Sequence, residues 1–393
     1  MEASVFVQYG KKLNPKKAAE TITQKDAKLA IIYTCLKDDN KSKEFFNYLI
    51  KNLPTPFIGV KVSGLITPKE GYTEDSIGIT TLSGDFETKI ITEEIDLQNP
   101  VNTANKLIQE LEPEGTCLTY TATYLWQLST IDAILRRIQT KNPNLKIFGG
   151  GSAPNPIIST NKGTYENHIA CAYIKKLNCE LDIYSGFKFD PDRNETITIT
   201  KSDELKIYEI NGKNAGDEYS RVQRMRPYFF NMLAKMLVRP DLPKVCKVLA
   251  KTSPSLYEGI LKFSVDLFGY EIEKGLVEPM TVYKINETDD SLAVGSYRPK
   301  GSTLRRVAVT KENQIALYDE ITEKYGKTNL TILNSCAFNA FWMDFNFKAV
   351  EEKLKKMKNP YMIGFFFGEY KTPNKKGQTD TTRNCIVDIM GIE

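Results

Sequence analysis

The feature that most constrains this chain is a unit of strand, helix and strand that recurs along it. The copies at residues 29–66 and 330–370 each have an apolar strand ending in Cys, an amphipathic helix, a proline and an Ile-Gly step. A looser third copy spans 117–155. Repeated units of this kind are typical of α/β proteins, which bury their helices against shared sheets. The sequence therefore predicts an α/β fold with layered mixed sheets flanked by helices.

The length of the chain and the segments between the copies suggest two modules. A chain of 393 residues is too long for one ordinary core and suits two domains of about 150–200 residues each. Residues 155–225 read as strand-rich, whereas 227–275 are apolar, helical in period and divided by prolines. We therefore predict a first module over 1–225, a helical connecting segment over 226–275 and a second module over 276–393.

Composition narrows the classes of partner and the compartment. The 53 Lys and Arg residues against 49 Asp and Glu leave a formal charge of +4, too weak a basic field to favour nucleic acid. The amino terminus lacks a secretory signal pattern, and no window reaches the roughly 18 consecutive apolar residues of a transmembrane helix. The seven cysteines stand singly, without a CxxC pair. We expect a cytoplasmic protein with reduced thiols, no transmembrane segment and no nucleic-acid partner.

Three consecutive glycines, Gly149, Gly150 and Gly151, close the second strand of the middle copy. Glycine tolerates positive φ and has no side chain, so its backbone allows a ligand to approach closely. Neither GxGxxG nor a P-loop lysine follows, so the triplet also fits a tight structural turn. Both interpretations stay open, and the triplet is a second candidate ligand site.

The chain has one histidine, His168, through which any Ser-His-Asp, Cys-His or multi-histidine metal site would have to pass. This shortage argues against most hydrolase chemistry, and we expect a protein that is not an enzyme and holds no metal.

Cys336 follows a buried strand at a turn, a position that often faces the ligand crevice of an α/β sheet. It is either a packed thiol or a pocket-lining one.

Two charged residues follow the last copy of the unit. Glu369 comes directly after an aromatic strand, and Arg383 opens the final strand. They predict either an ordinary ion pair at the surface or a site in which Arg383 clamps the carboxylate of a ligand.

The apolar stretch 227–270 predicts helices that pack against their own sheet, a partner's helix or a membrane surface.

In their order and spacing these segments resemble the FIST family, sensory proteins with an amino-terminal and a carboxy-terminal FIST module. The resemblance spans nearly the whole chain and implies two FIST modules. In the first module the landmarks are LAIIYTC, PFIGVKVSGLI, SIGITTLSGDF, NPNLKIFGGGSAPN and LKIYEINGKNA. In the second module they are AVGSYRPKGSTLRRVAV, NSCAFN, MIGFFFGEY and TTRNCIV.

Three positions of the second module depart from the family pattern. Asn339 stands where the family usually has an arginine, Arg383 where it has a histidine, and Ile386 where it has a threonine. One charge is lost and another is gained around the expected pocket, which indicates a different ligand. The residues that match the pattern are Cys336, Gly364, Gly368, Glu369 and Asn384.

The resemblance implies a cytoplasmic sensor that binds a small ligand, either an amino acid or another small anionic molecule, and signals to a kinase or a chemoreceptor. Some members of the family resemble haem-based nitric oxide sensors. The single histidine argues against haem here, although Cys or Tyr could still ligate one. We expect no cofactor. The predicted ligand-binding residues are Cys336, Asn339, Gly364, Gly368, Glu369, Tyr370, Arg383 and Asn384, with Gly149, Gly150 and Gly151 as the second candidate.

Two further classes of function stay open. The first is a protein-protein adaptor or scaffold in which the expected pocket is vestigial. The second is an enzyme that uses Cys336 as nucleophile and Glu369 as acid or base.

Overall fold

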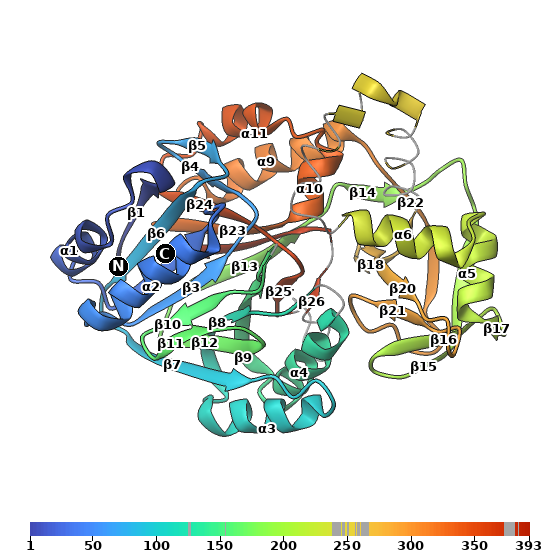
Figure 1. Cartoon of the computed structure of the whole chain (residues 1–393), viewed down its shortest axis with the longest axis horizontal. Coiled ribbons are helices and arrows are strands. Elements are labelled where there is room, and N and C mark those ends of the chain that lie inside the picture. The colour runs from blue at the N-terminus through green and yellow to red at the C-terminus, as the bar shows by residue number, and fades with distance from the viewer. Residues whose placement is uncertain are drawn as a thin grey trace.

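The computed structural model is a mixed α/β protein in which the strands of the described residues form four sheets. Three of these sheets have six strands each, and the fourth has nine. The predicted α/β fold, with mixed sheets and flanking helices, is confirmed (Figure 1). The structure describes residues 1–124, 127–153, 155–237, 245, 248–249, 251–255, 257, 260, 267–372, 382–383 and 385–393.

The three predicted copies belong to three longer repeats, which share one order of elements: strand, helix, strand, helix, strand, hairpin, strand. Repeat 1 comprises β1 (Glu2–Tyr9), the 3-10 turn Gly10–Lys12, α1 (Pro15–Gln24), β2 (Leu29–Thr34), α2 (Asp39–Asn52), β3 (Phe57–Lys61), the hairpin β4 (Leu65–Thr67) and β5 (Gly71–Thr73), and β6 (Ser76–Ser83). Repeat 2 comprises β7 (Glu87–Glu94), α3 (Pro100–Glu110), β8 (Glu114–Thr121), α4 (Leu128–Lys141), β9 (Asn144–Gly151), the hairpin β10 (Ile158–Thr160) and β11 (Gly163–Tyr165), and β12 (His168–Lys175). Repeat 3 comprises β13 (Cys179–Tyr184), α9 (Lys311–Tyr325), β23 (Leu330–Cys336), α10 (Ala337–Trp342), α11 (Phe347–Leu354), β24 (Tyr361–Phe366), the hairpin β25 (Glu369–Lys371) and β26 (Thr382–Arg383), and β27 (Val387–Ile392).

Local chemistry explains where the helices begin. The side chain of Asn14 accepts a hydrogen bond from the Lys17 amide and caps α1, whose first residue is a proline. Asp38 caps α2 in the same way, and Thr310 caps α9. Strands such as β2 have no exposed residue, as expected for strands that are covered on both faces.

The repeats exchange their hairpins in a closed ring. The four long strands of each repeat form one sheet, so that repeat 1 has the order β1-β6-β2-β3. The hairpin of repeat 1 extends the sheet of repeat 3, that of repeat 2 extends the sheet of repeat 1, and that of repeat 3 extends the sheet of repeat 2. No repeat completes its own sheet. The three repeats are therefore parts of one folded body.

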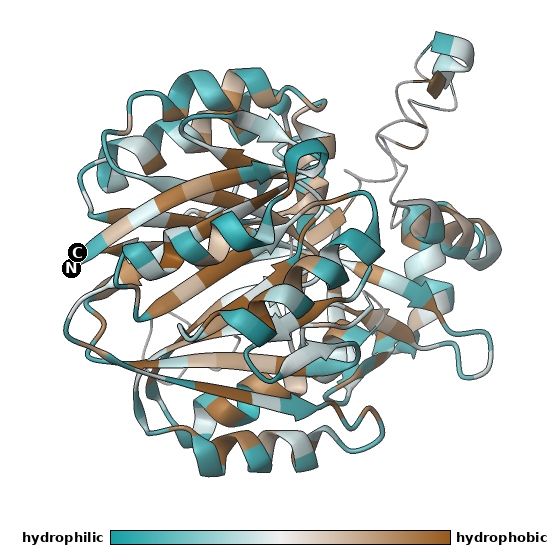
Figure 2. Cartoon of the chain, turned by 60° about the vertical axis from the view of Figure 1, so that its left-hand side comes forward, coloured by the Kyte–Doolittle hydropathy of each residue, from teal (hydrophilic) through white to brown (hydrophobic). Residues whose placement is uncertain are grey.

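The sheets face one another around a common core and carry their helices outside. Apolar residues of β2, β8 and β23 alternate between this central core and the outer cores under the helices. Figure 2 shows apolar strands inside and hydrophilic outer faces on the helices. At the centre the Tyr33 hydroxyl lies 2.7 Å from the Tyr120 hydroxyl and donates to Asn334 Oδ1 at 2.9 Å. Tyr33 of repeat 1, Tyr120 of repeat 2 and Asn334 of repeat 3 thus meet at the centre.

A separate lobe is inserted between β13 and α9 and lies on the right of Figure 1. It has its own apolar core of aliphatic and aromatic side chains, among them five isoleucines. Residues 267–273, which we expected to continue a helical stretch, form a strand that pairs with two neighbours. The lobe comprises β14 (Phe187–Phe189), β15 (Thr196–Ser202), β16 (Lys206–Ile210), β17 (Lys213–Asn214), α5 (Ala215–Gln223), α6 (Pro227–Leu237), β18 (Leu267–Glu273), β19 (Leu276–Met280), β20 (Val282–Ile285), β21 (Leu292–Val294) and β22 (Thr303–Val309).

The predicted division into 1–225, 226–275 and 276–393 does not coincide with the sheets. β13 pairs with β27, and β25 pairs with β9, so strands from the first and last of these ranges share sheets. The boundaries stay a prediction. In the part of the chain that the structure describes, no helix is long and apolar enough to cross a membrane.

Candidate functional site

The hairpin exchange brings the two predicted ligand sites together. β25 pairs with β9 on one side and with β26 on the other. In this register Glu369 lies opposite Gly150 in one direction and opposite Arg383 in the other. Residues that are about 220 positions apart in the sequence therefore form one site, at the place where the sheets of repeats 2 and 3 meet.

Arg383 is buried and contacts a carboxylate that we did not predict. Its guanidinium Nη1 lies 3.3 Å from Oε2 of Glu278, and both side chains are fully buried. Glu278 also accepts from the Tyr270 hydroxyl at 2.9 Å and lies 3.3 Å from Arg298 Nη2. The prediction of a surface ion pair between Glu369 and Arg383 is wrong, because Arg383 is directed to Glu278 of the lobe.

Two other buried carboxylates form no direct ion pair within the described residues. Glu369 and Asp388 are both fully buried. Within the described residues, no donor meets normal hydrogen-bond geometry at either oxygen of Glu369 or of Asp388, although the Cys336 thiol lies close enough to Glu369 to raise its pKa. A buried ionised carboxylate without a donor is strongly unfavourable, and native proteins satisfy nearly all such groups. These four oxygens are the most unusual feature of the site.

The electrostatics of the site follow from burial. Burial, and then the neighbouring Cys336 and Asp388, raise the pKa of Glu369 well above its usual range. Burial raises the pKa of Asp388 to about 7, against the opposing effect of Lys371 and Arg383. Burial likewise lowers the pKa of Lys371 to about 8, while Asp388 favours its charged form. The site therefore contains groups that change charge near neutral pH.

Cys336 is a packed thiol beside these carboxylates. Burial, and then its neighbour Cys385, raise the pKa of Cys336 well above the ordinary thiol value. Its backbone N–H donates to the Ile386 carbonyl, and the Asn339 side chain donates to the same carbonyl at 3.0 Å. Asn339 is itself buried and donates to the Ser335 hydroxyl at 3.1 Å. These contacts hold α10 against the ends of the strands. Because burial raises its pKa, Cys336 lacks the low pKa of a nucleophilic thiol.

The glycine triplet lies inside strand β9 and not in a turn. A Cβ atom on Gly149 would lie 1.6 Å from the Thr119 carbonyl oxygen, and one on Gly151 would lie 2.3 Å from the Phe367 carbonyl oxygen. The glycines thus let β8, β9 and β25 approach closely, as the backbone contact in the sheet requires. The Gly149 carbonyl accepts from the Asn334 amide at 2.7 Å, so this backbone is already occupied.

The remaining predicted residues support the hairpin. Gly368 has a φ of 83°, a conformation that favours glycine, and it makes the turn into β25. A Cβ atom on Gly364 would lie 2.7 Å from the Tyr33 ring. The Tyr370 hydroxyl lies 2.6 Å from the Thr121 hydroxyl, on the opposite face of β25 from Glu369. Asn384 lies outside the described residues.

Sequence reasoning missed Glu278, Asp388 and Lys371, although a comparison of the repeats would have signalled two important positions. The first residue of each hairpin pairs with the equivalent strand of another repeat's sheet. This residue is Leu65 in repeat 1, Ile158 in repeat 2 and Glu369 in repeat 3. Leu65 and Ile158 belong to the central apolar core. Asp388 pairs with Asn334, where the other repeats pair Gly78 with Tyr33 and Ala170 with Tyr120. Only repeat 3 has acids at these positions.

The single histidine stands apart from this centre. His168 begins β12, its ring stacks on Tyr165 at 4.7 Å, and its Nδ1 lies 2.7 Å from the Glu166 carbonyl. These surroundings do not fit a histidine-ligated haem at the buried centre. Among the described residues, no group of three or more His, Cys, Asp or Glu side chains is arranged to hold a metal ion.

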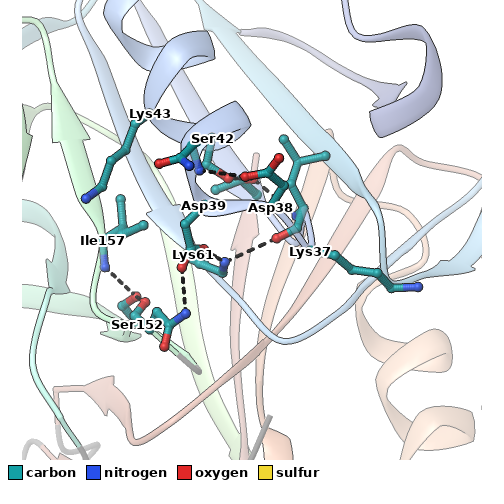
Figure 3. Close-up of polar contacts among 12 residues, drawn as sticks. Lys37, Asp38, Asp39, Ser42, Lys43, Lys61, Ser152 and Ile157 are labelled. Carbon is teal, nitrogen blue, oxygen red and sulfur yellow. Dashed lines mark hydrogen bonds and ion pairs between the residues drawn. The ribbon is translucent and has the colours of Figure 1, made fainter. Parts of the chain in front are cut away.

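A second polar cluster occupies the comparable strand ends of repeat 1 (Figure 3). Lys61 is buried, forms an ion pair with Asp39 and donates to the Leu36 carbonyl at 3.1 Å. Asn155 donates to the other oxygen of Asp39 at 2.6 Å. Both charges of the Lys61–Asp39 pair therefore have partners. A surface cavity of about 410 Å³ lies at the opposite strand ends of repeat 1, around Lys28, Pro56 and Phe86, away from both clusters.

Comparison with known families gives one assignment. Residues 28–213 match the FIST N domain. The FIST N domain is a predicted sensory domain of signal-transduction proteins. The match covers most of repeat 1, all of repeat 2 and the first strands of the lobe. A comparison with curated proteins found no match. The carboxy-terminal FIST module stays a prediction.

Proposed function

We propose that the protein is a cytoplasmic sensor that binds a small ligand at the buried charged centre and signals its occupancy to a protein partner. The observation that carries this proposal is the pair of buried carboxylates, Glu369 and Asp388, whose oxygens have no hydrogen-bond partner among the described residues. A ligand that satisfied these oxygens would remove their desolvation penalty. The FIST N domain match agrees with a sensory role. Amino acids are the first ligands to examine.

The position of the centre suits a sensor. It lies where the sheets of repeats 2 and 3 meet, and Glu278 of the lobe reaches into it. A ligand bound there would contact both the three-repeat body and the lobe. Because a ligand shifts a conformational equilibrium only through differential contacts, this junction is a suitable place for such a shift. A kinase or a chemoreceptor would be the partner that reads the shift.

The enzyme alternative has less support. A cysteine nucleophile needs a lowered pKa or an adjacent base, whereas burial raises the pKa of both Cys336 and its neighbour Glu369. We therefore propose a binding protein and not an enzyme. The adaptor alternative would leave the buried carboxylates without a role.

Native mass spectrometry of the freshly purified protein tests the proposed function. We expect a small molecule of defined mass to accompany the wild type, or one of the twenty amino acids to raise its Tm. The variant Glu369→Leu should lose both effects, while Glu166→Gln, which removes a carboxylate whose side chain is 61% exposed, should retain them. If neither method detects a ligand in the wild type, the sensor proposal is wrong.

A further inference from the structure

We propose that the ligand presents an ammonium group to Glu369 and Asp388, so that the site recognises the cationic end of the molecule. This inference rests on the proposed function and names the chemistry of the same site. It reverses the expectation that Arg383 clamps an anionic group. Three independent features of the structure support it.

The first feature is the state of Arg383. Arg383 already contacts a carboxylate of the protein, because its Nη1 lies 3.3 Å from Glu278 Oε2. This carboxylate occupies the role that an anionic ligand would otherwise have. Glu278 is also held by Arg298 and by the Tyr270 hydroxyl, so it is a fixed part of the structure. An anionic ligand at this guanidinium would have to share Arg383 with the buried Glu278 carboxylate, and bringing two carboxylates together in a buried site is costly.

The second feature is the kind of group left unsatisfied. The four oxygens of Glu369 and Asp388 accept hydrogen bonds and do not donate them when ionised. An ammonium group carries three donors and a positive charge, and it matches these acceptors in both respects. A divalent metal fits less well, because Ca²⁺ takes six to eight oxygen ligands. The described residues offer no cluster of that size.

The third feature is that the fold does not need these carboxylates. Leu65 and Ile158 occupy the position of Glu369 in the other two hairpins, and both lie in the central apolar core. Gly78 and Ala170 occupy the position of Asp388. The same topology therefore folds twice in this chain without charge at these two positions. The acids of repeat 3 need another explanation, and ligand binding provides one.

The electrostatics imply an exchange of one proton for the ammonium group. Burial favours the protonated form of Glu369 in the free protein. When the ammonium group binds, Glu369 ionises, its proton passes to the solvent, and the charge of the centre is unchanged. No covalent bond forms or breaks in the ligand. The other charged or titratable groups around Glu369 and Asp388 are Glu278, Tyr283, Cys336 and Arg383 from neighbouring strands and Lys371 from β25 itself.

Thermal shift measurements on the full chain with ethylammonium, propionate and L-alanine test this inference. These probes are similar in size and carry only the cation, only the anion, or both. We expect ethylammonium and alanine, but not propionate, to raise the Tm of the wild type, by about 2 °C at ten times the Kd. Calorimetry in two buffers of different ionisation enthalpy should show that about one proton is released per ligand bound, as linkage requires.

Variants test whether the Tm shift comes from binding at Glu369. Glu369→Leu should abolish the shift, and the isosteric Glu369→Gln serves if the leucine variant is poorly folded. Glu166→Gln should behave as the wild type. A shift with propionate and none with ethylammonium would overturn the ammonium inference but leave the sensor proposal intact. No shift with any probe, together with no ligand by mass spectrometry, would overturn both.

Discussion

Repeats 1 and 3 place opposite kinds of residue at the same position of the same fold. In repeat 1 the hairpin opens with Leu65, which fills the central apolar core, and in repeat 3 it opens with Glu369, which is just as deeply buried. The charged residues of the two regions also differ in their exposure to solvent. Lys61 in repeat 1 pairs with Asp39, whose side chain is 32% exposed, whereas the acids of repeat 3 are sealed from solvent. The proposed ligand site accounts for this difference, because the fold of repeat 1 is built without such acids.

The largest expected effect comes from copying the acid into another repeat. Ile158→Glu places a carboxylate at the position equivalent to Glu369, without the surroundings of repeat 3. Urea denaturation at pH 7 should show a loss of about 4 kcal/mol in the free energy of unfolding, because a buried acid must be kept protonated. The control Ile158→Leu should lose less than about 1.5 kcal/mol. A loss as small for the glutamate as for the leucine would refute the comparison.

Breaking one ion pair in each region should give unequal losses. Arg383→Met leaves Glu278 fully buried with one cation fewer, and we expect a loss of about 3 kcal/mol in unfolding free energy. Lys61→Met leaves Asp39, which water reaches, and we expect a loss of about 1 kcal/mol. Equal losses in urea denaturation would show that the two clusters do not differ in the way described.

The pH dependence of stability should separate the regions as well. The pKa of Asp388 is raised to about 7 in the folded protein, so the folded state binds more protons than the unfolded state between about pH 4 and pH 7. Stability from this group is therefore full at low pH and is lost as the pH rises through 7. We expect the free energy of unfolding to fall by about 2 kcal/mol from pH 5 to pH 7. Asp388→Asn should flatten this slope, and a slope unchanged by that variant would contradict the assignment.

The sequence predicted local structure well because local structure depends on nearby residues. The apolar runs at Leu29–Thr34 and Leu330–Cys336 and the amphipathic helices after them are visible in the periodicity. The hairpin exchange is not visible, because pairing between Glu369 and Gly150 depends on where three repeats pack and not on local pattern. For the same reason the predicted partner of Arg383 was wrong. Aligning Glu369 with Leu65 and Ile158 would have identified the unusual acid from the sequence alone.

The variant Glu369→Leu tests the central claim most directly, because it gives repeat 3 the residue of repeat 1. Urea denaturation in the absence of ligand should show an unfolding free energy that is unchanged or higher by about 1–3 kcal/mol, as expected when a buried charged group is replaced by an apolar one. The same protein should no longer gain stability from ethylammonium or alanine. A variant that loses about 2 kcal/mol or more without ligand, or that still responds to these probes, would show that Glu369 serves the fold.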